Sequence, residues 1–557
     1  MFYHLAALFA AWLTARGVQK YLSVRSASHA FGGCPDAGVL WLHPFRTVAL
    51  LSAPWFPLKD QIGYYFGKFA LYEKYGSTGI ASVSVWDATP TLWLADAQAI
   101  KIVATEATVF QKDVEAYEAL NIYGPNMVGT EGTDWRRHRR VANPAFNEAS
   151  NAFVWIETVR VVNEWFADMD TRTDADSFLT IDAVEDLVQL TLLVIASAGF
   201  GRRASWQEDS AATPPPGHKL AFRTAVSTAL AYLFIKVLTP AWLNALGARV
   251  PLPYLGRILT ETGESFDSLR GHMVDLVSLA RAWVVGGKVS NMDAGLLRNL
   301  VEANMTQADD VHHKKLTDEE LLSNIFTFLL AGHETSAHSL SFAVALLALY
   351  PDAQQKIYEE TLRVWPDGCP EAASPSSYKE CMPKLQYTLA TFYETIRLFT
   401  PVARLCKLVH ADATLTAHRF TPSATGTPTD VAPFAVPVKA GSMIIIDILA
   451  LHMNPMYWGA DAVEFKPARF VDTEAYRWPR DAFFGFSGGP RSCIGQRFAL
   501  TESVCALANL VRRYEIRVPG HLAGKPFAEQ KRSLLRWKPG VTITPTNCEV
   551  QLRRRAG

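Results

Sequence analysis

The chain has 557 residues, 49% of them hydrophobic, so it is long enough to bury a large core. Its 54 Lys and Arg residues balance its 54 Asp and Glu residues, and such a chain has no global field to attract nucleic acid. The seven cysteines are scattered without a Cys-x-x-Cys pair, which fits neither a disulfide framework nor a zinc site. We therefore expect a reducing compartment, no nucleic-acid partner, and cysteines that are mostly small buried hydrophobes.

The N-terminal segment from Phe2 to Ala15 is mostly apolar, but it is shorter than the roughly 20 residues that a membrane-spanning helix needs. A second apolar stretch, residues 39–58, contains an arginine and three prolines, which favours an interfacial position over a clean transmembrane helix. We expect residues 1–58 to form a membrane anchor or interfacial segment with a proline-rich hinge. The alternative is a buried N-terminal helix. A cleaved signal peptide is disfavoured because the basic residues follow the apolar run.

Helical periodicity dominates between about residues 90 and 410, for example in 153–169 and 183–200. Strand-like alternation is confined to short pieces, one near residue 80 and one at 436–447, where two strands are predicted around a Lys-Ala-Gly turn. Two segments rich in Pro, Thr and Ala predict surface loops, namely 211–217 and 421–433.

The longest predicted helix begins after Thr317, which forms a capping box with Glu320, and it ends before Pro351. Because this helix is apolar on most faces, we expect it to run through the interior of the protein. No linker divides the chain beyond the anchor. The expected fold class is therefore mainly α with small β-sheets, in one large helical domain that covers residues 59–557.

The segment FGFSGGPRSCIGQRFALTES, residues 484–503, places one cysteine among four glycines. Glycines permit a tight backbone approach and positive φ angles, and the amides of such a loop can point at a sulfur anion. The residues after Cys493 have helical periodicity, which places its sulfur near a helix N-terminus, where negative charge is favoured. Arg491 brings a cation that could pair with a carboxylate of a cofactor. These features are typical of a thiolate that binds a metal.

Phe486, Gly489, Arg491, Cys493 and Gly495 match the signature F-x-x-G-x-R-x-C-x-G of the cytochrome P450 superfamily, which this segment resembles. Five fixed positions at roughly 5% usage each recur by chance in a chain this long with a probability on the order of 10⁻⁴. A structural cysteine beside an ordinary turn is thereby disfavoured. The resemblance implies that Cys493 is the proximal ligand of the iron of haem b, with the other matched residues around the cofactor.

A second segment, AGHETS, matches the pattern A-G-x-[DE]-T-[ST] of the same superfamily at Ala331, Gly332, Glu334 and Thr335. The resemblance implies that the two small residues border the distal face of the haem and leave room for dioxygen. Glu334 and Thr335 would be the catalytic acid–alcohol pair that relays protons for O–O cleavage. The alternative is that Thr335 bonds back to the carbonyl of Ala331 and Glu334 is a solvated helix residue.

Glu394 and Arg397 match the E-x-x-R pattern of the superfamily, and Arg469 lies in the matching segment FKPARF. An isolated pair with this spacing stabilises a helix by only about 0.2–0.5 kcal/mol and is common. The resemblance instead implies a buried structural cluster of these three residues behind the haem.

The segment DWRRHRRVANPAF resembles the helix in which a Trp and an Arg contact a haem propionate, here Trp135 and Arg139. These basic residues could equally face solvent or lipid headgroups. A second propionate partner is expected from VARLCKLV, where Arg404 and Lys407 are both candidates and the sequence does not choose between them.

The resemblance covers nearly everything after residue 60, with the motifs in the order of the superfamily. It implies a haem-thiolate monooxygenase that hydroxylates or epoxidises a lipophilic small molecule with dioxygen. Because no flavin- or nicotinamide-binding domain is visible, electrons are expected from an NADPH-cytochrome P450 reductase. Similarity to fungal microsomal members favours the endoplasmic reticulum membrane, with the catalytic domain facing the cytosol and the N-terminus in the membrane.

Substrate contacts are expected from four places: residues 114–129, the helical pair around 225–260, Phe326 with Leu330, and residues 402–405. The apolar character of the pair suits a lipophilic substrate, although plain core packing explains it equally well. We expect a terpenoid or another specialised metabolite.

Two other functions share the same cofactor. A haem-thiolate isomerase or dehydratase needs no reductase, but a proton relay at Glu334 and Thr335 would then have no purpose. A non-enzymatic haem carrier or sensor needs an exchangeable ligand and an output domain, and none is visible in the sequence.

Overall fold

A computed structural model of the protein describes residues 2–40, 67–84, 88–172, 178–240, 242–243, 253–286, 295–305 and 315–555. The chain forms two compact units, each built from segments that are distant in the sequence. The first unit consists of Met1–Ala116, Val402–Glu464 and Trp478–Cys493. The second consists of Tyr117–Pro401, Phe465–Arg477 and Ile494–Gly557. The predicted end of the anchor at residue 58 lies outside the described residues, as does most of the second apolar stretch.

A mixed sheet forms the centre of the first unit, with the strand order β1-β2-β3-β9-β6-β4 among the described residues. β9 lies between β3 and β6 and is buried along its whole length, which suits its run of β-branched isoleucines. The strands are β1 Asp36–Leu40, β2 Gly79–Ser84, β3 Pro90–Leu94, β4 Phe110–Lys112, β6 Arg404–Val409 and β9 Met443–Asp447.

A two-stranded antiparallel ribbon, β7 Ala413–Thr421 with β8 Thr429–Val438, also belongs to the first unit. The predicted loop at 421–433 is therefore wrong in its second half, because residues from 429 onward belong to β8. The two strands predicted in 436–447 exist as the end of β8 and as β9, but they do not pair as a hairpin. β8 pairs with β7, and its prolines suit a strand at an edge.

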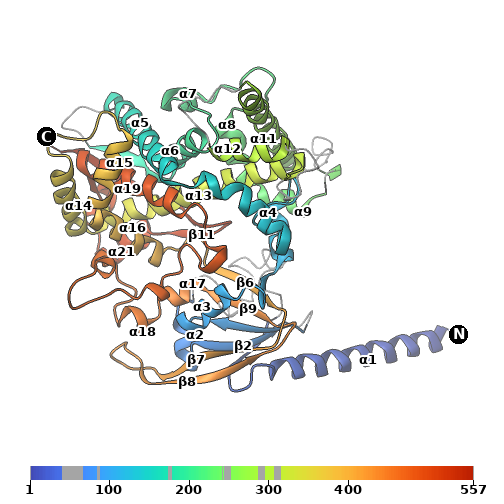
Figure 1. Ribbon diagram of the computed structural model, residues 1–557. Coiled ribbons are helices and arrows are strands. Elements are labelled where there is room, and N and C mark those ends of the chain that lie inside the picture. The colour runs from blue at the N-terminus through green and yellow to red at the C-terminus, as the bar shows by residue number, and fades with distance from the viewer. Residues whose placement is uncertain are drawn as a thin grey trace. The chain divides into compact units, whose positions relative to one another are not determined.

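The first unit also contains several short helices and one long helix, α1, which Figure 1 shows extending away from the strands. Among the described residues, no helix combines the length and the apolar character that crossing a membrane requires. The helices are α1 Phe2–Ser28, α2 Ala70–Tyr75, α3 Ala97–Thr105, α17 Ile448–His452 and α18 Pro455–Trp458, with the 3-10 turns η7 Arg480–Ala482 and η8 Gly489–Arg491.

The second unit is a bundle around α13 Asp318–Leu349, which runs among α6, α16 and α19 (Figure 1). The predicted capping box is confirmed, because the Thr317 hydroxyl accepts from the Glu320 amide while the Glu320 carboxylate accepts from the Thr317 amide. Pro351 occupies the first turn of the next helix, as expected of a residue that cannot continue α13. The prediction of a mainly α fold with small sheets is confirmed.

The remaining elements of the second unit complete this bundle and add two small sheets, β5-β13-β10 and β11-β12. Both helices predicted at 153–169 and 183–200 are confirmed as α5 and α6, and 211–217 is an exposed loop. The other helices are η2 Val114–Leu120, α4 Gly132–Ala142, η3 Asn143–Ala145, α5 Glu148–Arg172, α6 Ala183–Ala198, α7 Trp206–Ser210, α8 Phe222–Ala231, α9 Leu233–Leu238, α11 Pro253–Val285, α12 Gly295–Met305, α14 Pro351–Val364, α15 Pro375–Cys381, η5 Met382–Lys384, α16 Gln386–Leu398, η6 Pro467–Phe470, α19 Gln496–Arg513, α20 Gly520–Ala523 and α21 Phe527–Leu534. The strands are β5 Leu179–Asp182, β10 Tyr514–Arg517, β11 Trp537–Pro539, β12 Ile543–Pro545 and β13 Glu549–Arg554.

Candidate active site

Cys493 lies at the end of a glycine-rich loop that folds back on itself in the first unit. Its amide donates to the carbonyl of Phe486 at 2.9 Å, and the amide of Ser492 donates to the carbonyl of Gly489 at 3.1 Å. Ser487 adopts a left-handed conformation with φ of 60°. Cys493 therefore lies shortly before Gly495, which is the N-cap of α19. This is the position near a helix N-terminus that the sequence predicts.

Gly489 allows this loop to approach α3 closely. Its φ is +66°, and a Cβ atom at this position would lie 2.3 Å from the carbonyl oxygen of Ala104. Any larger residue would push the loop away from α3 and displace the cysteine. The start of the loop is fixed as well, because the amide of Phe484 donates to Nε2 of His452 in α17 at 2.8 Å.

All seven cysteines lie in the described part of the chain, and none of them forms a disulfide. Cys493 is the exposed one, whereas Cys406, Cys505 and Cys548 are buried and the other three are partly buried. Burial raises the pKa of the Cys505 thiol well above its ordinary value, as is expected of an inert structural cysteine. Accessibility therefore singles out Cys493 as the thiol available to a cofactor.

Arg404 and Lys407 both lie in β6. Because they are three residues apart in a strand, their side chains point to opposite faces of the sheet. Arg404 lies across from Asp447, with 3.8 Å between Nε and Oδ2, and its guanidinium is 5.4 Å from the centre of the Trp93 ring. Tyr72 donates its hydroxyl to the same Asp447 at 3.3 Å. Arg404 thus has an anionic partner within the first unit, and its contact with a haem propionate stays a prediction.

In the second unit, α13 is exposed at its first turn, Asp318 and Glu319, and again around the AGHETS segment. Ala331 is exposed and Gly332, Glu334 and Thr335 are partly exposed, whereas residues 321–330 and 336–349 are buried. Protein interiors are close-packed, so an interior helix exposes small residues only where protein does not fill the adjacent space. The exposed stretch coincides with the segment that is predicted to cross the cofactor.

Gly332 brings α6 close to this stretch. A Cβ atom on Gly332 would lie 3.0 Å from Cγ1 of Ile195, which is tighter than ordinary van der Waals contact. One turn earlier on α6, the Thr191 hydroxyl donates to the carbonyl of His333 at 3.1 Å. α6 therefore holds the backbone of α13 on one face, at the same residues where the opposite face of α13 is exposed.

Thr335 donates its hydroxyl to the Ala331 carbonyl at 2.7 Å, as the alternative interpretation of this motif predicts. Glu334, in contrast, is no solvated helix residue. Its side chain is 14% exposed, and Oε1 accepts a hydrogen bond of 3.4 Å from the Thr542 hydroxyl. Burial raises the pKa of Glu334 to about 7, although that hydrogen bond lowers it. A carboxyl group that titrates near neutral pH can both accept and release protons.

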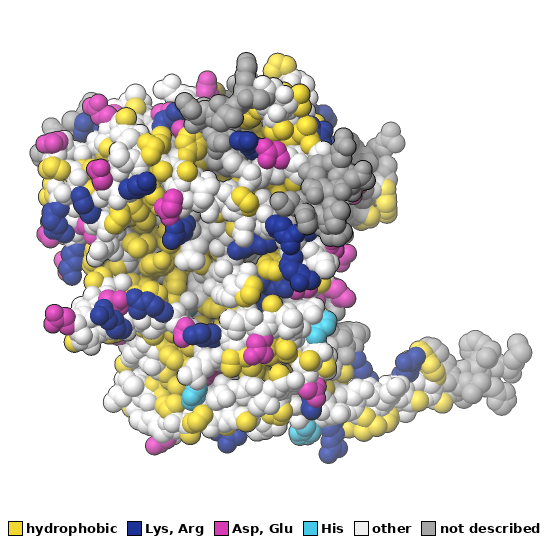
Figure 2. All heavy atoms as spheres, in the orientation of Figure 1, with side chains coloured by type: hydrophobic (Ala, Val, Ile, Leu, Met, Phe, Trp, Pro, Cys, Tyr) yellow, Lys and Arg dark blue, Asp and Glu magenta, His cyan; other side chains and the backbone are white. Residues whose placement is uncertain are grey.

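Trp135 and Arg139 lie one turn apart on α4, and both are partly buried. The spacing places them on one face of the helix, as their predicted shared role at a propionate requires. Arg136 and Arg140 on the same helix are exposed. Figure 2 shows Lys and Arg side chains gathered over the region of α4 in Figure 1.

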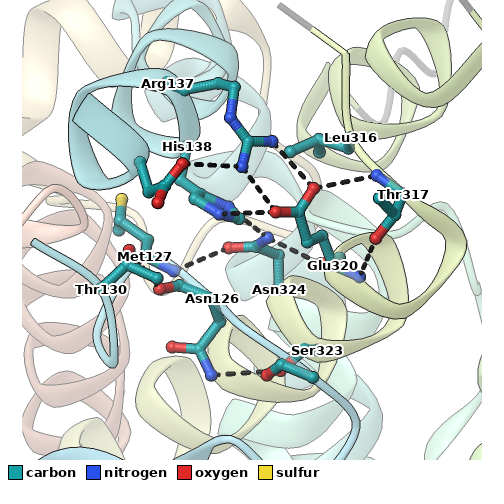
Figure 3. A network of polar contacts seen from close by, with 12 residues as sticks. Asn126, Met127, Thr130, Arg137, His138, Leu316, Thr317, Glu320, Ser323 and Asn324 are labelled. Atoms are coloured by element: carbon teal, nitrogen blue, oxygen red, sulfur yellow. Dashed lines mark hydrogen bonds and ion pairs between the residues drawn. The ribbon is translucent and has the colours of Figure 1, made fainter.

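The other basic residues of α4 fasten this helix to the start of α13 (Figure 3). Arg137 donates to both carboxylate oxygens of Glu320, at 2.5 and 2.8 Å, and Nε2 of His138 lies 3.6 Å from the same carboxylate. Although burial opposes ionisation, the two hydrogen bonds from Arg137 hold the pKa of Glu320 well below its ordinary value. One ionised carboxylate therefore caps α13 and binds α4.

Asn324 extends this network to the loop before α4 (Figure 3). Its Nδ2 lies 2.8 Å from Nδ1 of His138, and its Oδ1 accepts from the amide of Met127 at 3.1 Å. Asn126 in the same loop donates to the hydroxyl of Ser323 at 3.1 Å. The loop that is predicted to contact substrate is thus tied to α13 by buried side chains.

The predicted cluster of Glu394, Arg397 and Arg469 is present in the second unit. Arg397 donates to Glu394 through Nε at 2.7 Å and through Nη2 at 2.9 Å, and both side chains are fully buried. Nε of Arg469 lies 3.6 Å from the same carboxylate, and the amide of Lys466 donates to it at 2.8 Å. The carboxylate therefore joins α16 to the segment around η6.

The predicted site residues fall in two groups. Those of the first unit are Arg404, Phe486, Arg491 and Cys493, and those of the second are Trp135, Arg139, Ala331, Gly332, Glu334, Thr335 and Gly495. Their convergence on one haem stays a prediction. Sequence reasoning missed Thr542 and His338, which surround Glu334, and Asn324, which joins three segments. No short motif marks these residues, because their partners are far away in the sequence.

A family model described as cytochrome P450 matches residues 50–544. Similar proteins include cytochrome P450 monooxygenase 124 of Postia placenta, 38% identical over 86% of this chain and 85% of that protein. Cytochrome P450 monooxygenase prx9 of Penicillium rubens is 27% identical over 76% of this chain and 73% of its own length. Secologanin synthase 2 of Catharanthus roseus is 25% identical over 79% and 76%.

The chain belongs to the cytochrome P450 family. It is an oxidoreductase of the cytochrome P450 monooxygenase class, whose cofactor is a haem with a thiolate-ligated iron and whose members use dioxygen and a redox partner. The residues present fit this cofactor. Cys493 is exposed and follows a loop whose approach to α3 requires a glycine at position 489. The interior helix α13 exposes the small residues Ala331 and Gly332 at its AGHETS segment.

Proposed function

We propose that the protein hydroxylates or epoxidises a lipophilic small molecule, with dioxygen and with electrons from an NADPH-cytochrome P450 reductase. The observation that carries this proposal is the exposed Cys493 within the complete signature from Phe486 to Gly495. A thiolate-ligated haem supplies oxygen activation, because electron density from sulfur favours cleavage of the O–O bond. The side chains of this chain supply binding, proton delivery and exclusion of water.

Cys493 would hold the iron of haem b, and Phe486, Arg491 and Gly495 would border the cofactor near its ligand. Trp135 and Arg139 would bind one propionate, and Arg404 would bind the other with Asp447 balancing its charge. Charge-assisted hydrogen bonds from Arg to carboxylates are strong and directional. Ala331 and Gly332 would leave room for dioxygen, since neither residue extends beyond Cβ.

Glu334 and Thr335 would handle protons. The raised pKa of Glu334 keeps a fraction of this carboxyl protonated at neutral pH, so it can donate and be reloaded. The Thr335 hydroxyl donates to the Ala331 carbonyl, and its oxygen can still accept a hydrogen bond, so it can orient a donor without losing its own partner. The partial burial of both side chains limits competing water.

Electrons would arrive through a surface that carries positive charge. The exposed Arg136 and Arg140 of α4 would attract an acidic patch on a reductase. Such steering falls with ionic strength, because salt screens exposed charges. Reduction by the reductase should therefore slow as salt is added.

α1 would attach the protein to the endoplasmic reticulum membrane, with the catalytic part in the cytosol. The helix exposes Trp12, Val18, Tyr21 and Leu22, each more than half exposed, together with basic residues. Exposed aromatic and aliphatic side chains beside basic residues would favour contact with a bilayer interface, because the apolar parts can reach lipid while the charges stay in water. Substrate would then enter from the membrane, which suits a terpenoid or another specialised metabolite.

Isotope labelling tests the proposed reaction. Microsomes that contain the protein and a reductase are supplied with NADPH, ¹⁸O₂ and lipophilic extracts of the source organism. The expected product gains one ¹⁸O atom and forms only when NADPH and reductase are both present. Product that forms without reductase and carries no ¹⁸O would instead identify an isomerase or dehydratase.

A further inference from the structure

We propose that His338 and Thr542 form a proton path to Glu334, so that an imidazole and a hydroxyl group reload the acid of the AGHETS segment. The inference rests on the proposed function, because a reload path matters only if Glu334 delivers protons during turnover. All three residues belong to the second unit, and no motif in the sequence links them.

The three side chains form a continuous hydrogen-bonded row. Nδ1 of His338 lies 2.7 Å from the hydroxyl oxygen of Thr542, and that oxygen lies 3.4 Å from Oε1 of Glu334. The direct distance from His338 Nδ1 to Glu334 Oε1 is 3.9 Å, too long for a hydrogen bond. The Thr542 hydroxyl is therefore the bridge between the imidazole and the carboxyl group.

Two different parts of the fold meet at this bridge. His338 stands one turn after Glu334 on α13, so the two side chains share a face of that helix. Thr542 lies in the turn between β11 and β12, whose register pairs Pro539 with Ile543. The amide of Ile543 donates to the carbonyl of Pro401 at 3.1 Å, which fixes the turn beside α13.

Burial separates this row from bulk water. Thr542 is 3% exposed and His338 is 6% exposed, so bulk water has little access to the bridge. Within the described part of the chain, Oε2 of Glu334 is buried and has no hydrogen-bond partner. One oxygen of the carboxyl group thus receives the proton and the other remains available to pass it on.

The proton transfer balances with one proton that water supplies to Nε2 of His338. In the first arrangement, His338 carries its proton on Nδ1 and donates to Thr542, and Thr542 donates to the ionised Glu334. A proton that arrives at Nε2 of His338 releases the Nδ1 proton to Thr542, whose own proton moves to Glu334. The result is a neutral Glu334 and an imidazole with its proton on Nε2. Rotation of the hydroxyl and exchange of the imidazole tautomer restore the first arrangement.

The charges around the row favour this direction. Burial, together with the nearby His333 and Lys538, lowers the pKa of His338 to about 4. Burial raises the pKa of Glu334 to about 7. At neutral pH a proton therefore resides on Glu334 more readily than on His338. His333 is not a second route, because its Nδ1 donates to the carbonyl of Leu329 at 2.6 Å.

The test compares Thr542→Val, Thr542→Ser and His338→Gln with the controls Thr546→Val and His272→Gln. Thr546 is exposed in the segment after the turn, and His272 is a histidine of α11 that is as buried as His338. We expect Thr542→Val and His338→Gln to form about tenfold less product per NADPH consumed, because slower proton delivery diverts electrons from the product-forming step. Thr542→Ser should restore coupling, and both controls should keep it.

A second readout does not depend on turnover. The carboxylic C=O band of Glu334 is followed by infrared spectroscopy as a function of pH and is assigned by its loss in Glu334→Gln. Because the Thr542 hydroxyl lowers the pKa of Glu334, Thr542→Val should raise the midpoint of this band and Thr542→Ser should return it. Unchanged coupling together with an unchanged midpoint in Thr542→Val would overturn the proposed path.

The two proposals fail in different ways. If the carbon monoxide complex of the reduced wild-type protein shows thiolate ligation and product forms, but Thr542→Val and His338→Gln remain fully coupled, only the path is wrong. If the wild-type protein shows no thiolate-ligated haem, the proposed function itself is wrong.

Discussion

Arg397 donates two hydrogen bonds to Glu394, one turn earlier in α16, and neither side chain is exposed. Removing one member of such a pair leaves a buried charge without compensation. We expect Arg397→Ala or Glu394→Ala to lower the free energy of unfolding by about 3–5 kcal/mol. Thermal unfolding of the purified variants measures this loss. A change smaller than that of an exposed ion-pair control, Lys101→Ala, would contradict the buried role.

Asn324 is expected to matter for both stability and substrate binding. Asn324→Ala leaves Nδ1 of His138 and the amide of Met127 without their present partners. Each buried polar group that loses its partner lowers the free energy of unfolding by about 1–3 kcal/mol. Because Met127 lies in the predicted substrate loop, the substrate-induced spectral shift should also weaken. Wild-type substrate affinity in a folded Asn324→Ala variant would show that this anchoring does not shape the pocket.

Glu334 makes stability depend on pH with a defined sign. Its pKa rises from 4.5 when unfolded to about 7 when folded, so folding favours the protonated form. The associated stability is present below pH 4.5 and is lost as the pH rises to 7, a difference of about 3 kcal/mol. Glu334→Gln should therefore lose less stability than wild type between pH 5 and pH 8. Parallel unfolding curves for both proteins across this range would refute the assignment.

Thr335→Ala should uncouple NADPH consumption from product formation. The variant removes the hydroxyl group that is proposed to orient the proton donor. It also removes the hydrogen bond to the Ala331 carbonyl, but water can replace that bond on this exposed stretch. We expect about a tenfold lower yield of product per NADPH and more hydrogen peroxide. Thr335→Ser serves as the control, and equal coupling in Thr335→Ala and wild type would remove Thr335 from the mechanism.

Local signals predicted much of the fold and of the site. The capping box of Thr317 and Glu320 and the proline at 351 define α13, because these signals act within a turn of the helix end. The strand pairing of residues 436–447 does not follow from local signals. Two strands around a turn look like a hairpin in the sequence, but β8 pairs with β7, and β9 pairs with β3 and β6. The row from His338 to Thr542 spans 204 residues, and only the folded chain brings such side chains together.

The carbon monoxide difference spectrum of the reduced protein tests ligation by Cys493 most directly. A haem bound through this sulfur should give a Soret band strongly red-shifted from that of histidine-ligated haem. The wild-type protein should show this band, and Cys493→His should lose it while keeping the helical content of the fold. Retention of the red-shifted band in Cys493→His would mean that another residue binds the iron.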